Sequence, residues 1–213
     1  MKNISRYLSR GGSGPLFSFS SINPRHLQVI QAQMKDRKFS LSIIAGTCSF
    51  CRWGYPRVIL CKPLFRNRPF PTLFWLSCPW LVLQAGRLES EGGVGEMEKV
   101  LFERVPAWTL YNMEASMMRL FLIPPFQRTF LKRYYPRIHK VLRRTEVGGI
   151  YPAERPTVKC LHLQLASFLA MDSHPADDWL LTKFPVLSCP DPGTEVCGNF
   201  QPPLNTALPG GLK

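Results

Sequence analysis

Acidic residues are almost missing from the first third of the sequence. Residues 1–70 contain twelve Lys and Arg side chains and one carboxylate, Asp36, whereas residues 71–150 contain eleven basic and seven acidic residues. Such a basic segment is typical of proteins that contact nucleic acid, an anionic lipid surface or an acidic partner, and it is equally typical of a flexible leader. The charge distribution therefore predicts an anionic partner at this third of the chain or a solvated leader.

The sequence also lacks a long, uninterrupted apolar run. Residues 1–20 contain charges and glycines but no apolar stretch of the kind that an export signal requires. The longest apolar segment, residues 73–85, is interrupted by Pro79 and is too short to span a bilayer. We therefore expect no transmembrane segment and a cytoplasmic location, where the seven cysteines are reduced thiols or metal ligands more often than disulfides.

The common signatures of nucleotide and nucleic-acid binding are missing as well. The glycine-rich stretch 92–95 lacks the preceding strand and the following lysine of a phosphate-binding loop. No sequence motif of a known nucleic-acid-binding module is present. Any contact with an anionic partner must therefore rest on basic and aromatic side chains. The sequence indicates no nucleotide cofactor.

The composition predicts one structured domain with two tails. The length of 213 residues suffices for one substantial core, and twenty prolines predict many loops and broken helices. Residues 1–22 are expected to be a flexible basic leader with a Gly-rich linker at 11–15, and residues 191–213 a Pro/Gly-rich disordered tail. The domain itself is expected over residues 23–190.

Strand and helix patterns alternate within that domain. Residues 57–61 and 72–76 are rich in β-forming side chains and are joined by a polar loop, which predicts a hairpin. Helical periodicity follows from Trp80, from residues 96–104, 108–121 and 126–144, and again over residues 160–171. We therefore expect an α+β fold in which a small β-hairpin packs against four or five α-helices.

Cys78 lies where the second of these strands meets a helix. Pro79 suits the first helical turn, where its missing N–H costs nothing, and Leu81, Val82 and Ala85 continue at helical spacing. The positive end of the helix dipole favours a thiolate at such a junction. Cys78 is therefore a candidate site residue.

Two other short segments carry metal-ligand residue types. Cys51 is followed by Gly54 in a sequence that can form a turn with the sulfur pointing inward. Cys160 and His162 are two residues apart, so on a regular helix they would diverge by about 200°. They can bind one metal ion only if the helix begins between them.

These motifs resemble the bacterial family known as domain of unknown function 501, over about residues 25–190. The family pattern is C-x-x-G-x-P, then FPT-x-x-x-L-x-CP, then RLE, then KCLH. The residues that match it here are Cys51, Gly54 and Pro56; Phe70, Pro71, Thr72, Cys78 and Pro79; Arg87, Leu88 and Glu89; and Lys159, Cys160, Leu161 and His162. Many relatives carry a second histidine where this chain has Gln164. The family has no established activity, so the resemblance implies candidate residues and no reaction.

One hypothesis is a structural metal site. Cys51, Cys78 and Cys160 would be thiolate ligands, with His162 or alternatively Cys189 as the fourth. Zinc prefers four tetrahedral N and S ligands, and ligands from distant segments would clamp the hairpin to two helices. An iron–sulfur cluster is less favoured, because it prefers cysteine at every position.

Three alternatives remain open at the level of sequence. The cysteines can be small buried apolar side chains. Cys78, activated by the helix terminus and by His162, can act as a nucleophile in a cysteine enzyme. The chain can also bind nucleic acid or an acidic partner through its basic segments, including residues 126–144, with Arg52, Arg87 and Lys159 as candidate anion contacts.

Overall fold

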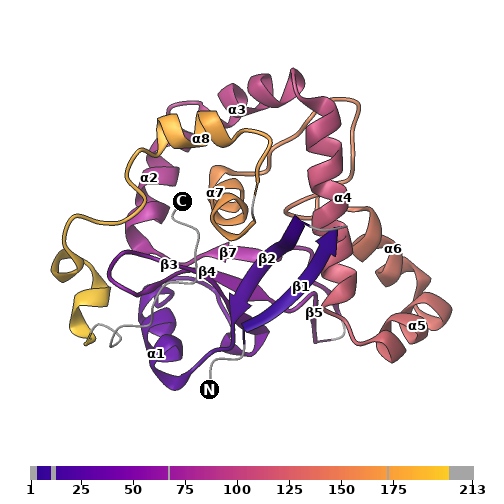
Figure 1. Ribbon diagram of the computed structural model, residues 1–213, viewed down its shortest axis with the longest axis horizontal. Helices are drawn as coiled ribbons and strands as arrows, with labels where there is room; N and C mark the ends of the chain where they lie inside the picture. Colours follow the sequence, from indigo (N-terminus) through magenta and orange to yellow (C-terminus); the bar gives the residue numbers. More distant parts are fainter. Residues whose placement is uncertain (1–3, 11–12, 67, 172, 202–213) are drawn as a thin grey trace.

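The computed structural model describes residues 4–10, 13–66, 68–171 and 173–201, with side chains from Phe19 onward. These residues form eight α-helices and an antiparallel sheet, which confirms the α+β class (Figure 1). The helices outnumber the expected four or five. Pro136 divides the segment 126–144 into two helices, and the helix at residues 177–183 was not predicted.

Prolines mark most helix starts. A proline occupies the first or second position of five of the eight described helices, where its fixed φ is already helical. The helices are α1 (Pro24–Gln33), α2 (Pro79–Ser90), α3 (Gly93–Phe102), α4 (Val105–Phe121), α5 (Pro125–Tyr134), α6 (Pro136–Arg144), α7 (Leu161–Ala170) and α8 (Asp177–Lys183). A 3₁₀ turn, η1 (Leu41–Ile43), precedes the central strands.

The main sheet is antiparallel and has the strand order β1-β2-β3-β4-β7. Its strands are β1 (Ile4–Arg10), β2 (Ser13–Ser20), β3 (Ile44–Phe50), β4 (Pro56–Cys61) and β7 (Phe74–Leu76), and a separate two-stranded ribbon is formed by β5 (Leu64–Phe65) and β6 (Arg68–Pro69). The pairing of Val58 with Leu76 and of Leu60 with Phe74 confirms the predicted hairpin.

Strand β4 is covered on both faces, and all six of its residues are buried. Val58 and Leu60 belong to the large core that contains α7, whereas Ile59 and Cys61 belong to a second core around α1. This division follows from the alternation of side chains along a strand. A strand buried on both faces explains why residues 58–61 form a continuous apolar run.

Helix α7 lies at the centre of the molecule. Figure 1 shows it above the sheet, enclosed by α2, α3, α4 and α8, whereas α1 covers the opposite face of the sheet. Leu161, Leu165 and Phe168 are fully buried, and even Gln164 has no exposed surface. Each buried leucine or phenylalanine contributes about 1.5–3 kcal/mol, so the position of α7 is strongly determined by packing.

A buried arginine fixes the loop that leads to α7. The Arg119 guanidinium, from α4, donates to the carbonyl oxygens of Leu142 at 3.0 Å, of Glu146 at 3.2 Å and, at closer range, of Thr145. Burial lowers the pKa of Arg119 to about 10, and these carbonyls, together with that of Pro71 at 3.2 Å, replace the water that this side chain has lost. The loop is therefore anchored to α4 before the chain enters α7.

The two predicted tails contain secondary structure in their described parts. Residues 4–10 and 13–20 form β1 and β2, and residues 192–199 form two 3₁₀ turns, η2 (Pro192–Thr194) and η3 (Val196–Asn199). Residues 1–3, 11–12 and 202–213, which belong to the predicted leader and tail, lie outside the described residues. Among the described helices, none is both long and apolar enough to cross a bilayer.

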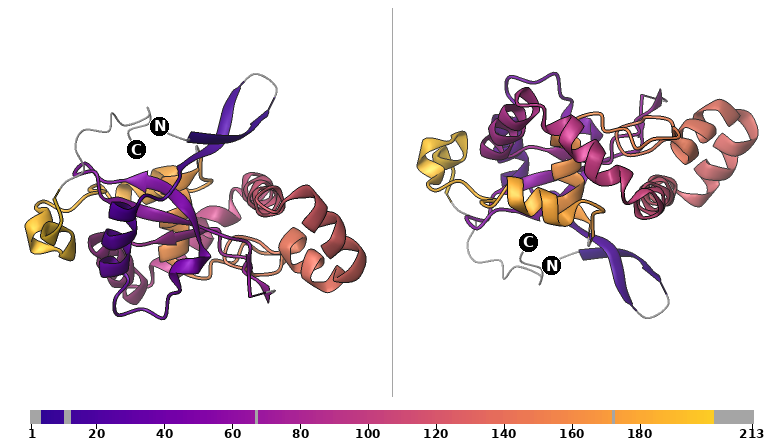
Figure 2. Two further views of the ribbon diagram at one scale, coloured as in Figure 1. Left: turned by 90° about the horizontal axis from the view of Figure 1, so that it is seen from below. Right: turned by 90° about the horizontal axis from the view of Figure 1, so that it is seen from above.

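Helices α5 and α6 form one end of the molecule, away from α7 (Figure 2). They pack on each other and on α4 through a small apolar cluster of Ile123, Leu131 and Leu142. Most other side chains of the pair face solvent. The basic segment predicted over residues 126–144 is therefore presented as a surface.

Candidate functional site

The structure distributes the four predicted metal ligands over two places, at opposite ends of α2. Cys78 is the residue that precedes the first turn of α2, and Glu89 lies in its last turn. Eleven residues separate them, which corresponds to about 16 Å along a helix. Cys160 and His162 lie beside Glu89, whereas Cys51 lies near Cys78.

Glu89, Cys160 and His162 form a compact triad. One ligand atom from each lies within 4.8 Å of the other two, and no other such group of three is present among the described residues. Nδ1 of His162 lies 2.9 Å from Oε1 of Glu89. The His162 and Glu89 side chains are 29% and 26% exposed, so solvent reaches the triad.

The start of α7 brings the two motif residues together. Cys160 has an extended backbone with φ −168° and ψ 155°, and α7 begins at Leu161. The helix therefore starts between Cys160 and His162, which is the condition under which both can face one ion. Glu89 completes this arrangement because its Oε1 accepts the backbone N–H groups of Leu161 at 2.5 Å and of His162 at 3.3 Å.

Both ring nitrogens of His162 face oxygen. Nδ1 faces the Glu89 carboxylate, and Nε2 lies 3.1 Å from the carbonyl oxygen of Val82. Neither oxygen has a proton to give, so a neutral imidazole satisfies only one of these contacts. Two states satisfy the geometry: an imidazolium that donates to both oxygens, or a ring whose Nδ1 binds a cation while Nε2–H donates to Val82.

The thiol of Cys160 experiences opposing effects. Burial raises its pKa, and the charge of Glu89 raises it further, whereas the N–H groups of Leu163 and His162 and the charge of Lys159 lower it. The negative charge of the Glu89 carboxylate therefore disfavours a second negative charge on the Cys160 sulfur. A bound cation would relieve that opposition for both groups at once.

Cys78 occupies the helix terminus that the sequence predicted, but the thiolate is not favoured there. Burial raises the pKa of Cys78 to about 12, and this effect outweighs the hydrogen bond from the Leu81 N–H. His162 has one ring nitrogen against Glu89, in the last turn of α2, and the other against the carbonyl of Val82, one turn after Cys78, so both nitrogens face other partners. The structure therefore does not bring the proposed nucleophile and base together.

Cys51 lies in a tight turn after β3. Its N–H donates to the Tyr55 carbonyl at 2.9 Å, and its own carbonyl accepts the Gly54 N–H at 2.8 Å. Gly54 has φ +81°, a conformation that L side chains rarely adopt. Cys189 is buried opposite this turn, and its carbonyl accepts the Trp53 indole N–H at 3.0 Å.

The three candidate anion contacts have different surroundings. Arg52 donates to the Pro190 carbonyl at 2.7 Å and lies over the Trp53 ring, so it joins the turn to the C-terminal segment. Lys159 reaches the Gly148 carbonyl at 3.3 Å. Arg87 is exposed in the last turn of α2, where a cation stabilises the helix dipole.

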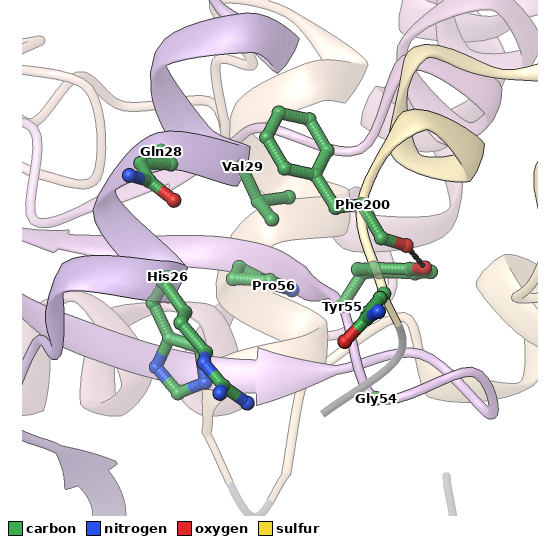
Figure 3. A pocket seen from close by; sticks show the side chains of 9 residues that line it. His26, Gln28, Val29, Gly54, Tyr55, Pro56 and Phe200 are labelled. Atoms are coloured by element: carbon green, nitrogen blue, oxygen red, sulfur yellow. Dashed lines mark hydrogen bonds between the residues drawn. The ribbon is translucent and has the colours of Figure 1, made fainter. Parts of the chain in front are cut away.

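A pocket borders the Cys51 turn. It lies between α1 and residues 54–56, and Figure 3 shows Val29, Tyr55 and Phe200 around it, with the Tyr55 hydroxyl donating to the Phe200 carbonyl at 2.6 Å. Its lining is mostly apolar. No cluster of metal ligands faces it among the described residues.

Sequence reasoning missed Glu89 as a ligand and did not single out Cys197. Glu89 stands in the RLE motif, and its place in that motif was the one signal that the sequence offered. Cys197 lies in a segment whose Pro and Gly content predicted disorder, yet it is buried against Val29 and Tyr55. No local pattern predicts that contact, because it joins residues far apart in the chain.

Comparison with known proteins gives one match. The sequence model of the family described as "Protein of unknown function (DUF501)" matches residues 47–182. This range includes Cys51, Cys78, Glu89, Cys160 and His162, and it ends before Cys189. No curated protein and no solved structure matches the chain.

Proposed function

The chain belongs to the DUF501 family, and we propose that it binds one zinc ion through Glu89, Cys160 and His162. The observation that carries this proposal is the convergence of a carboxylate, a sulfur and an imidazole nitrogen within 4.8 Å at the junction of α2 and α7. The three residues belong to two separate sequence motifs, RLE and KCLH. Their meeting is a property of the tertiary structure.

The donor set favours zinc over other common ions. Zinc accepts thiolate, imidazole and carboxylate ligands, whereas magnesium and calcium prefer oxygen alone. An iron–sulfur cluster requires more thiolates than this triad offers. The position of Nδ1 beside Glu89 matches a zinc-binding ring whose other nitrogen donates its proton to a backbone carbonyl, here that of Val82.

The ion would join the end of α2 to the start of α7 and leave one coordination position to solvent. Three protein ligands with a fourth open position are typical of zinc sites that do chemistry, whereas closed structural sites have four. The partial exposure of His162 and Glu89 agrees with an open position. The site is therefore proposed as a zinc centre that is open to a small ligand.

Metal analysis of the purified full-length chain tests this proposal. Cys160→Ala removes only the sulfur and keeps the Glu89 cap on α7, so we expect it to lose one zinc equivalent per chain while the circular dichroism spectrum is unchanged. His162→Gln should lose the same equivalent. His139→Gln, which changes an unrelated histidine on α6, should retain it. Unchanged zinc content in Cys160→Ala and His162→Gln would leave the imidazolium–carboxylate pair as the explanation of the triad.

A second candidate function is binding of single-stranded nucleic acid through the α5–α6 surface. Residues 125–144 contain seven Lys and Arg and no acidic residue. Four aromatic rings on this surface are half exposed or more: Phe126, Phe130, Tyr134 and Tyr135. Charges that contact phosphates, together with rings on which bases stack, are the features of non-specific single-strand binding.

The electrostatics of this surface favour an anion. Burial lowers the pKa of His139, and the positive charges of Arg143 and Lys132 lower it further. The Arg133 guanidinium lies over the Tyr134 ring, 5.6 Å from its centre. Binding to single-stranded RNA that weakens as salt rises tests this function, and salt-independent binding would contradict it.

A further inference from the structure

A cavity lies between α4, the end of α6 and the segment 151–156. Its volume is about 480 Å³, compared with about 190 Å³ for the pocket beside the Cys51 turn. This volume is within the range of about 300–1,000 Å³ that is typical of small-molecule sites. None of the lining residues belongs to the Glu89–Cys160–His162 triad, so the cavity is a separate candidate site.

Glu146 brings a carboxyl group to this cavity. The residue lines the cavity wall and is only 8% exposed. Its backbone N–H donates to the Ile150 carbonyl, and its own carbonyl accepts the Gly149 N–H, but no described residue forms an ion pair or hydrogen bond with its carboxyl group. Burial raises the pKa of this carboxyl, as expected for a group that has lost water without gaining a partner. A positively charged ligand group would supply that partner.

Two side chains of α4 hold the Glu146 backbone in place. Oδ1 of Asn112 accepts the Val147 N–H at 2.9 Å, and its Nδ2 donates to the Trp108 carbonyl at 3.0 Å. The Arg119 guanidinium donates to the Glu146 carbonyl at 3.2 Å. The wall that carries the carboxyl group is therefore fixed before a ligand binds, which lowers the entropy cost of recognition.

Positive charges stand at the exposed edge of the same cavity. Arg143 and Arg144, in the last turn of α6, line the cavity, and both are exposed. Neither forms an ion pair with a carboxylate of the described residues, and neither pairs with Glu146, although it follows them closely in the chain. The cavity thus presents one unpaired carboxyl group and two unpaired guanidinium groups that do not neutralise each other.

Aromatic and apolar side chains form much of the remaining wall. Trp108 is buried, whereas Met113 and Tyr151 are more than half exposed at the rim. These side chains offer dispersion contacts to the body of a ligand, and the faces of aromatic rings also attract an ammonium group. The cavity therefore combines an apolar wall with charges of both signs.

We infer that this cavity binds a small zwitterion, a free amino acid or a short peptide with an apolar or aromatic side chain. The ammonium group of the ligand pairs with Glu146, and its carboxylate pairs with Arg143 or Arg144. Its side chain packs against Trp108 and Met113. An anion alone would leave the carboxyl group of Glu146 without a partner, and a cation alone would leave the two arginines to solvent, so neither matches the cavity as well.

Calorimetric titration of the full-length chain with matched ligands tests the charge requirement. L-Tryptophan carries both charges, tryptamine lacks the carboxylate, and indole-3-propionate lacks the ammonium group. We expect L-tryptophan to bind at least about tenfold more tightly than either analogue. The dipeptide L-tryptophyl-L-leucine distinguishes the two sources of a zwitterion, since the tighter binder of the two identifies the class that the cavity fits. An analogue that binds as tightly as L-tryptophan, or the absence of binding by both zwitterions, overturns the inference.

Variants that remove charge with little change in size assign the two contacts. Glu146→Gln should weaken L-tryptophan binding at least about tenfold and leave indole-3-propionate binding unchanged, because that analogue has no ammonium group. Arg143→Gln/Arg144→Gln should weaken L-tryptophan binding and leave tryptamine binding unchanged. Glu103→Gln, which removes an exposed carboxylate outside the cavity, should bind all three as the unaltered chain does. An unchanged circular dichroism spectrum confirms that each variant is folded, and L-tryptophan binding that survives Glu146→Gln overturns the inference.

Discussion

At the scale of single residues, burial decides the chemistry of this protein more often than sequence position does. Cys78 stands at a helix N-terminus, where the dipole favours a thiolate, and yet desolvation raises its pKa to about 12. The motif predicted the position of the sulfur correctly. It could not predict the protonation state, because that depends on how completely distant segments cover the thiol.

Glu146 offers a pH-dependent test of the same effect. Burial raises the pKa of Glu146 above its usual value of 4.5, so the native state holds this proton more tightly than the unfolded state. The stability it contributes is fully present below pH 4.5 and is lost as pH rises through the native pKa. Glu146→Gln removes this component.

We therefore expect the free energy of unfolding of the unaltered chain, minus that of Glu146→Gln, to fall as pH rises from about 4 to about 7. Urea unfolding of both chains across this range measures the difference, and other titrating groups cancel because both chains contain them. A difference that is constant or that increases with pH would show that Glu146 is not more readily protonated in the native state.

At the scale of elements, the loop between α6 and α7 is the most constrained connection near the triad. Gly149 has φ +84°, and a Cβ there would lie 2.4 Å from Cγ of Pro71. The neighbouring Gly148 has φ +87°. Together with the anchor from Arg119, this loop determines where Cys160 enters the site.

Gly149→Ala should destabilise the fold by at least about 1–2 kcal/mol from its left-handed backbone alone, and by more because of the contact with Pro71. Gly95→Ala is the matched control. Gly95 lies in α3 with nothing within 4 Å of the added Cβ, so alanine there should stabilise the protein by about 0.5–1 kcal/mol. Chemical denaturation measures both effects, and a destabilisation of equal size at the two positions would refute this account of the loop.

Local patterns predicted most elements, but not how they meet. The hairpin of β4 and β7 and the helices that follow Cys78 and Cys160 were visible in the sequence, because strand and helix periodicity are short-range properties. The meeting of Glu89 with His162 was not visible, since it depends on the packing of α7 against α2. The helix α8 was missed because its seven residues are too few for a clear helical pattern.

At the scale of the whole molecule, the excess positive charge is not uniformly available to a partner. In the N-terminal third, Arg57 is buried, Arg37 donates to the Leu76 carbonyl at 2.9 Å, and Arg52 donates to the Pro190 carbonyl. These arginines hold the fold together. The α5–α6 surface, in contrast, presents its charges to solvent.

Two triple variants with equal loss of charge compare these regions. We expect Arg133→Ala/Arg137→Ala/Lys140→Ala to weaken single-stranded RNA binding and to reduce the slope of log affinity against log salt by about 2. Arg25→Ala/Lys35→Ala/Lys38→Ala, in the N-terminal third, should have a smaller effect. Fluorescence anisotropy at several salt concentrations measures both, and the reverse order would place the binding surface in the N-terminal third.

The double coverage of β4 has a consequence for biosynthesis. The α1 face of this strand can be covered as soon as the first sixty or so residues have left the ribosome, but its other face waits for α7, about a hundred residues later. Until then a nascent chain carries Val58 and Leu60 uncovered. At typical elongation rates of about 5–20 residues per second, the nascent chain therefore exposes this apolar surface for several seconds. Chaperone binding in that interval would protect it from aggregation.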